Sequence, residues 1–72
     1  MKLKKIIKIL PAWERIRVWG SDENTPVFDG CVEDIPCRLE DRKLIEGPDG
    51  AYLDIRYGCA DIENHVAVFI EE

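Results

Sequence analysis

Glycines and prolines break this chain into short apolar segments, and that spacing limits the available folds more than any other feature. The densest groups of turn formers lie at residues 20–26 and 47–50. No apolar segment approaches the roughly 20 residues that a membrane-spanning helix needs. Short segments joined by tight turns are typical of a small antiparallel sheet that closes on itself. The sequence therefore predicts a mainly β fold, a small antiparallel barrel or roll of five to six strands.

Alternation of apolar and polar residues locates the expected strands. The segment 14–19 alternates most clearly, because Ile16 and Val18 share one parity and Arg15 and Arg17 the other. Further strands are expected at residues 2–10, 27–32, 43–46, 51–57 and 65–70. For the first of these an amphipathic helix is the weaker alternative, since β-branched isoleucines favour the pleated backbone.

Turn signals indicate how these strands are joined. Gly47-Pro48-Asp49-Gly50 is the strongest of them and predicts a hairpin between the segments 43–46 and 51–57. Residues 20–26 are expected to form a second hairpin loop. Gly30, inside an expected strand, predicts a bulge or a bend of the sheet.

A short helical turn is expected near Pro36. Asp34 and Pro36 are residues typical of a helix start, and Ile35 and Leu39 stand four apart, as on one helical face. Alternation of Ile35, Cys37 and Leu39 would support a strand instead, but Pro36 lacks a donor for a sheet ladder. The residues expected in the core on either side of the Gly47 turn are Ile35, Leu39, Leu53 and Ile55.

Length and charge restrict the classes of function. A chain of 72 residues holds one core, so residues 1–72 are expected to form a single domain. The formal net charge of −5 repels nucleic-acid phosphates and anionic membrane surfaces at long range. The lysine-rich start is like a secretory signal, but Lys8 interrupts its apolar run and no small-residue cleavage site follows. A cytoplasmic protein is expected, with nucleic acid and membranes disfavoured as partners.

Three cysteines and the single histidine raise the question of metal binding. Cys31, Cys37, Cys59 and His65 supply the Cys3His set of structural zinc sites, yet five residues separate the members of each successive pair. Compact zinc motifs leave only about two to four residues between paired cysteines. Reduced, structural thiols without a cofactor are the prediction, and a zinc-stabilised domain is an alternative.

Catalytic motifs are sparse. Cys59 and His65 are the one cysteine and histidine pair suited to nucleophilic catalysis, and no glycine-rich nucleophile turn accompanies them. A run of carboxylates of this kind is usually a solvated face; its members are Glu33, Asp34, Glu40 and Asp41. The prediction is a protein that is not an enzyme.

Aromatic side chains are the candidates for partner binding. Trp13, Trp19 and Tyr52, together with open strand edges, indicate a protein-interaction module or self-association. Arg15 and Arg17 beside the tryptophans are also compatible with a nucleic-acid-associated small barrel of the Sm-like or oligonucleotide-binding kind. A protein-interaction module or accessory factor is the preferred hypothesis, and the nucleic-acid-associated barrel is the alternative.

A sparse motif contains Phe28-Asp29-Gly30, Asp34-Ile35-Pro36, Leu39 and Arg42. It resembles a pattern in small uncharacterised proteins carried by bacterial phages and other mobile elements. The motif covers about a quarter of the chain, and Cys37 stands where the pattern has an aromatic residue. The resemblance implies a compact cytoplasmic protein and assigns it no activity, cofactor or functional residue.

Overall fold

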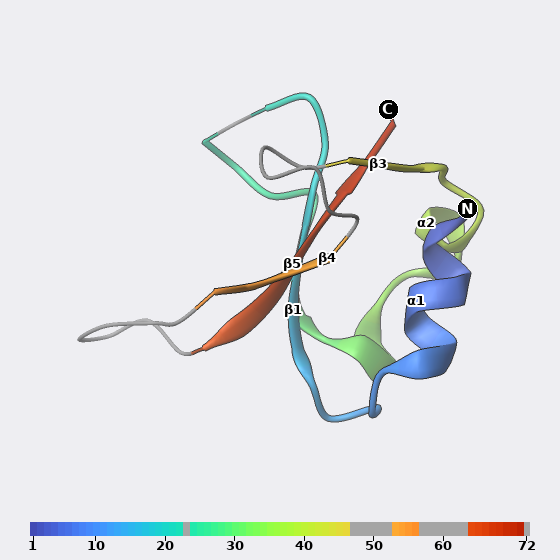
Figure 1. Ribbon diagram of the computed structural model, residues 1–72, viewed down its shortest axis with the longest axis vertical. Coiled ribbons are helices and arrows are strands. Elements are labelled where there is room, and N and C mark those ends of the chain that lie inside the picture. The colour runs from blue at the N-terminus through green and yellow to red at the C-terminus, as the bar shows by residue number, and fades with distance from the viewer. Residues whose placement is uncertain (23, 47–52, 57–63, 72) are drawn as a thin grey trace.

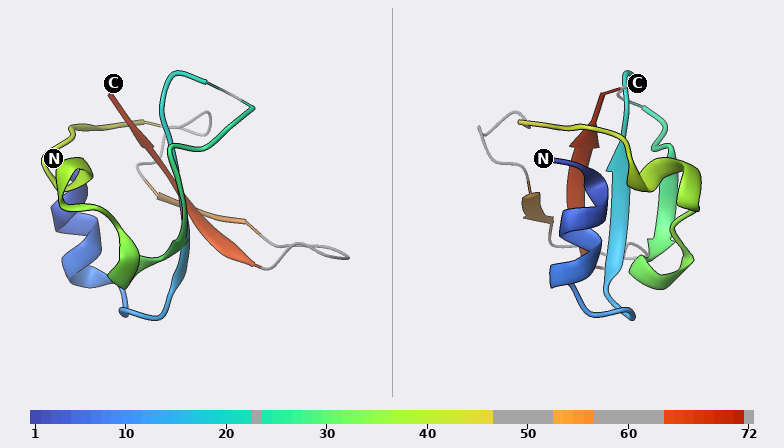
Figure 2. Two further views of the ribbon diagram at one scale, coloured as in Figure 1. Left: turned by 180° about the vertical axis from the view of Figure 1, so that it is seen from behind. Right: turned by 90° about the vertical axis from the view of Figure 1, so that its right-hand side faces the viewer.

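The protein is built on one mixed β-sheet with two helices packed on one of its faces (Figures 1 and 2). The computed structural model describes residues 1–22, 24–46, 53–56 and 64–71. The elements in chain order are α1 (Leu3–Ile9), β1 (Arg15–Trp19), β2 (Phe28–Cys31), a 3-10 turn η1 (Val32–Asp34), α2 (Cys37–Glu40), β3 (Leu44–Ile45), β4 (Leu53–Arg56) and β5 (His65–Ile70). The expected helical turn after Pro36 is confirmed as α2.

The sheet is open. Its strand order is β2-β1-β5-β3, and β4 also pairs with β5. Among the described residues no pairing connects β2 to β3 or β4, so the mainly β character is confirmed and the predicted closed barrel is not. The central strands β1 and β5 run parallel, in contrast to the expected all-antiparallel sheet. A parallel pair needs a long crossover, and here the chain makes it through β2, the helical turns and β3 and β4.

The first element is a helix, so the expected strand at residues 2–10 is wrong. Leu3, Ile6 and Leu10 recur at helical spacing; the first two are buried, and Leu10 packs against the same core. The lysines between them remain in water. Burial of one apolar stripe against the sheet outweighs the mild preference of β-branched isoleucines for strands.

The predicted hairpin between residues 43–46 and 51–57 is also wrong. Both β3 and β4 run antiparallel to β5, so they share one direction and cannot pair as a hairpin. Ile45 faces Phe69 and Leu53 faces the next residue, Val68, so β3 and β4 pair with consecutive positions of the same edge of β5. Turn-forming residues indicate where a strand ends, but they do not determine which strand it pairs with. The turn at residues 47–50 itself lies outside the described residues.

The hairpin of β1 and β2 confirms the loop expected at residues 20–26. The pairing runs without a break from Arg15 opposite Cys31 to Val18 opposite Phe28, so the bulge expected at Gly30 is wrong. The glycine serves a packing purpose instead. A Cβ atom on Gly30 would lie 3.0 Å from Cζ of Phe28, whose ring therefore needs the space that a side chain here would fill.

The core lies between the helices and the face of the sheet that they cover. It contains Leu3, Ile6, Ile16, Val18, Val32, Leu39, Leu44, Val66, Val68 and Ile70. Leu39 is buried as predicted, and Ile35 and Leu53 pack against the edge of the cluster. The fourth expected core side chain, Ile55, lies outside the described side chains.

Candidate functional site: the open face of the sheet

The face of the sheet opposite the helices carries the candidate functional site (Figures 1 and 2). Successive side chains of a strand point to opposite faces, so the neighbours of the buried valines and isoleucines point away from the helices. We call this surface the open face. Its described members are Arg15, Arg17, Trp19, Asp29, Cys31, Ile45, His65, Ala67 and Phe69.

Three large apolar side chains form a row across the open face. Trp19 of β1 faces Phe69 of β5, and Phe69 faces Ile45 of β3. The tryptophan and the phenylalanine are half-buried, and 41% of Ile45 is exposed. Ile45 and Phe69 stand opposite one another in an antiparallel pair, where Cβ atoms lie about 4.5–5.5 Å apart, and Trp19 stands beside Phe69 in the parallel pair, so the three residues are cross-strand neighbours. We call this set the apolar row.

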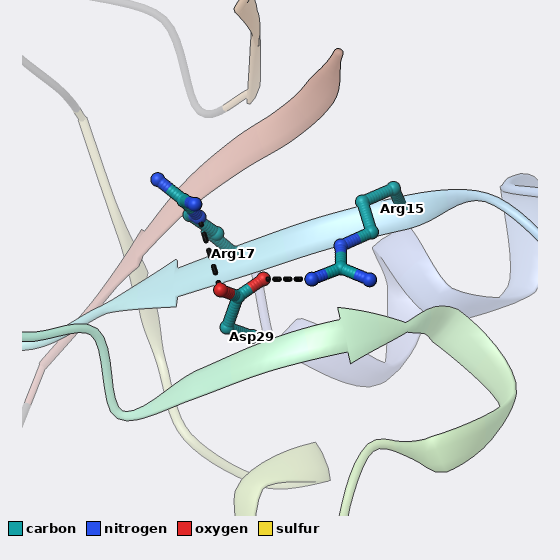
Figure 3. Close-up of polar contacts among 3 residues, drawn as sticks. All are labelled: Arg15, Arg17 and Asp29. Atoms are coloured by element: carbon teal, nitrogen blue, oxygen red, sulfur yellow. Dashed lines mark hydrogen bonds and ion pairs between the residues drawn. The ribbon is translucent and has the colours of Figure 1, made fainter. Parts of the chain in front are cut away.

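Two arginines share one carboxylate beside the apolar row (Figure 3). Nη2 of Arg15 donates a hydrogen bond of 3.2 Å to Oδ1 of Asp29, and Nε of Arg17 lies 3.3 Å from its Oδ2. The hairpin register brings them together, because Asp29 in β2 stands directly opposite Arg17 in β1. We call these three residues the Arg–Asp cluster.

The Arg–Asp cluster is partly shielded from water. Only 27% of the Arg17 side chain and 33% of the Asp29 side chain are exposed. Nε of Arg17 is buried and has no hydrogen-bond partner of good geometry among the described residues. The ion pair with Asp29 offsets the cost of removing this nitrogen from water. Pairs with this much exposure stabilise a fold by about 0.2–1 kcal/mol. The cluster therefore contributes little to stability and fixes the charge pattern of the face.

The three aromatic residues expected to bind a partner do not lie together on the open face. Trp19 lies on the open face, whereas Trp13 lies in the turn after α1 with 73% of its surface exposed. Tyr52 lies outside the described residues. Sequence reasoning missed Phe69 and Ile45. Phe69 could have been found from the sequence, because it alternates with Val68 and Ile70 in β5 and therefore points to the opposite face. Ile45 could not, since a strand of two residues shows no alternation.

The candidate zinc ligands are not brought together in the described part of the chain. Cys31 is half-buried on β2, Cys37 is exposed on α2, and His65 begins β5. Because β1 lies between β2 and β5, Cys31 and His65 are separated by two strand spacings, about 10 Å. The described residues contain no group of three or more side chains placed to hold a metal ion. Cys59, the fourth candidate and the proposed catalytic partner of His65, lies outside them.

The acidic run does not converge on a point. Glu33 and Asp34 are exposed on η1, and Asp41 after α2 faces Lys2 at 3.8 Å and Lys4 at 3.6 Å. Carboxylates that share a proton or a substrate must lie within a few Å of each other, and these are spread over separate elements. Their arrangement is that of a solvated surface.

The fold and the open face define a class: a small two-layer domain with helices on one side of a mixed sheet and no described helix on the other. Within the described residues no helix has the length and apolar character to cross a bilayer. Comparisons with protein-family models, with curated proteins and with solved structures each find no match to this chain.

Proposed function

We propose that this protein is a small non-enzymatic interaction module that binds another protein through the open face. The observation that carries the proposal is the apolar row of Trp19, Phe69 and Ile45, which crosses three neighbouring strands on the face turned away from α1 and α2. The Arg–Asp cluster lies beside it. An apolar centre with aromatic residues and a polar, arginine-containing rim is the usual composition of a protein-binding surface.

The Arg–Asp cluster argues for protein over nucleic acid. Among the described side chains of this face, Arg15 and Arg17 are the cations that a nucleic-acid interface would use, and both are turned to Asp29 (Figure 3). A phosphate arriving there would meet a carboxylate between the two guanidinium groups, which costs electrostatic energy. A protein partner with both donors and acceptors meets no such penalty.

The edge of the sheet supports the same proposal. β2 is the terminal strand of the order β2-β1-β5-β3, and in the described part of the chain it pairs with β1 alone. The backbone groups on its second edge are therefore placed for strand addition by a partner chain. A partner that extends the sheet at β2 would lie next to the Arg–Asp cluster.

The test compares two apolar-to-lysine substitutions. Ile45→Lys places a charge in the apolar row, and Trp13→Lys makes the same kind of change at an exposed site outside it. The purified chain and both variants serve as baits in a lysate of native host cells, with captured proteins identified by mass spectrometry and self-association measured by sedimentation velocity. We expect a specific partner, foreign or a second copy, to bind the parent and the Trp13 variant and to be lost from the Ile45 variant.

A nucleic-acid function has a distinct signature. Fluorescence anisotropy at low salt would then show micromolar or tighter binding of mixed single-stranded or duplex oligonucleotides, with steep weakening as salt rises. Loss of that binding in an Arg15→Gln/Arg17→Gln variant, with no effect of Ile45→Lys, would replace the proposed function with the nucleic-acid alternative.

A further inference from the structure

All five lysines of the chain lie on one side of the molecule, around α1. They are Lys2, Lys4, Lys5, Lys8 and Lys43, and we call this set the lysine surface. The last of them is distant in sequence but forms an antiparallel bridge with Lys2. A backbone hydrogen bond of 2.9 Å from Leu3 N–H to Arg42 O holds the two segments together. Figure 2 shows that α1 lies on the outside of the sheet's covered face.

The lysine surface keeps most of its charge. All five side chains are exposed. Lys2 and Lys4 lie 3.8 and 3.6 Å from Asp41, whose side chain is 74% exposed, so these contacts are weak and easily exchanged. The other three lysines make no ion pair with any residue that the structure describes.

The net charge of −5 does not show that all the lysines lie around α1. Outside the lysine surface the chain has five basic side chains, all arginines, against fifteen acidic ones. Electrostatic screening limits the reach of a charge to about 10 Å at 0.1 M salt. The molecule measures 33 × 25 × 19 Å, so an anionic group at the lysine surface is screened from acidic residues on the far side. Asp41 beside Lys2 and Lys4, and Glu71 beside Lys43, lie within this reach, so the repulsion expected from the net charge is reduced at this surface but not removed.

Ile9 identifies the kind of anionic partner. This residue ends α1 one helical turn after Lys5, so the two side chains are neighbours, and 68% of Ile9 is exposed. A phosphate backbone offers nothing to an aliphatic side chain. Trp13, exposed in the turn after α1, is an aromatic on which a base could stack, so the affinity for an oligonucleotide is the measurement that separates the two partners. A bilayer would need the apolar stripe of α1, but Leu3 and Ile6 are buried in the core. An acidic protein segment with one apolar residue fits both features.

We propose that the lysine surface, with Ile9, binds an acidic protein segment that inserts an apolar side chain beside α1. This surface lies on the opposite side of the sheet from the open face, so the protein has two separate binding surfaces. The two proposals stand independently, because their variants share no residue.

The experiment uses fluorescence anisotropy with labelled peptides built from repeated Glu-Glu-Leu units. Lys5→Gln/Lys8→Gln removes two charges from the lysine surface. Asn24→Asp/Thr25→Asp changes the net charge by the same amount in the exposed loop between β1 and β2, away from α1 (Figure 1). We expect binding to weaken about tenfold in the lysine variant and less than about twofold in the loop variant, and to weaken further as salt rises.

A separate measurement tests the apolar contact between Ile9 and the leucine of the peptide. Ile9→Ser, or replacement of leucine by serine in the peptide, is expected to weaken binding about threefold, and the two changes together no further than either alone. Far-ultraviolet circular dichroism confirms that each exposed substitution leaves the fold intact, and Ile45→Lys should leave peptide affinity unchanged.

Four results would overturn the proposal. The first is no peptide binding even at low salt. The second is an equal loss in the lysine and loop variants, which reports only net charge. The third is indifference to Ile9 and to the peptide leucine. The fourth is lysine-dependent binding that is tighter for a mixed-sequence single-stranded oligonucleotide, or for phosphatidylserine vesicles, than for the peptide; that outcome assigns the surface to nucleic acid or to a membrane.

Discussion

The two faces of the sheet are made by the same strands and differ in nearly every property. On the covered face Ile16, Val18 and Val68 are fully buried aliphatic residues beneath the helices. On the open face their neighbours in sequence include Trp19 and Arg17, which remain partly in water. Alternation along a strand thus divides one short chain into a side that forms the core and a side that we propose for binding. Substitutions should affect stability on one face and binding on the other.

The largest loss of stability is expected from truncation on the covered face. Ile16→Ala removes three carbons from a fully buried residue of a central strand, which costs about 2–5 kcal/mol when the cavity does not collapse. A domain of this size has only a few kcal/mol of stability, so the variant should be largely unfolded at room temperature. Urea denaturation followed by circular dichroism measures the loss, and a value below about 0.5 kcal/mol would contradict the assignment of the core.

Gly30 offers a smaller and more specific test of the same face. An added Cβ would lie 3.0 Å from the tip of the Phe28 ring, so Gly30→Ala is expected to cost about 1 kcal/mol as the ring shifts. In a Phe28→Leu background the obstruction is gone. There the same substitution should be neutral or stabilising by up to about 1 kcal/mol, because alanine loses less backbone entropy than glycine on folding.

The double-mutant cycle for Gly30 and Phe28 is measured by urea denaturation. Equal effects of Gly30→Ala in the two backgrounds would show that the ring does not require the glycine. The physical reason for a glycine in this strand would then have to be sought elsewhere, since its pairing opposite Ile16 is regular.

The sequence predicts where several strands lie, but it does not predict which strands pair. Strand positions came from alternation, which is local: residues 14–19 and 65–70 alternate or are continuously apolar, and β1 and β5 are found there. The partner of each strand depends on contacts distant in sequence. Nothing near Leu44 or Leu53 indicates that both strands pair with β5 instead of with each other.

The first helix shows why local propensity failed. Isoleucines favour strands by a few tenths of a kcal/mol each, whereas burial of one large aliphatic side chain contributes about 1.5–3 kcal/mol. The packing of Leu3 and Ile6 against the sheet therefore decides the conformation of α1. The sequence named Trp19 as a partner-binding candidate and the two arginines for the nucleic-acid alternative. Asp29 between the arginines depends on the hairpin register, which the sequence does not specify.

On the open face the Arg–Asp cluster is expected to have a modest energy. A double-mutant cycle with Arg17→Gln and Asp29→Asn should give a coupling of about 0.2–1 kcal/mol, since both side chains are partly exposed. The coupling of Asp29 with Arg15 should be smaller, because 42% of that arginine side chain is exposed. Urea midpoints in low and high salt measure both. A coupling above about 2 kcal/mol for either pair would mean that the cluster is a stabilising element of the fold.

The smallest effect on stability is expected at Ile45, and it gives the sharpest comparison with Ile16. Both are isoleucines of the same sheet, on opposite faces, but Ile45 is 41% exposed and stands at the end of the apolar row. Ile45→Lys leaves no cavity, and its long stem can still cover Phe69 while its ammonium group stays in water. The change in unfolding free energy should therefore stay within about 0.5 kcal/mol, the range of ordinary surface substitutions.

Binding at the open face, unlike stability, should be strongly reduced by Ile45→Lys. A lysine buried in a protein interface loses its hydration when the partner arrives, and at a hot-spot residue such a change costs about 2 kcal/mol or more of binding energy. A stable Ile45 variant that no longer retains the partner, beside a Trp13→Lys variant that does, would separate the two faces as proposed. If the Ile45 variant unfolds, the residue belongs to the structural side of the sheet, and the apolar row is part of the core rather than a surface for binding.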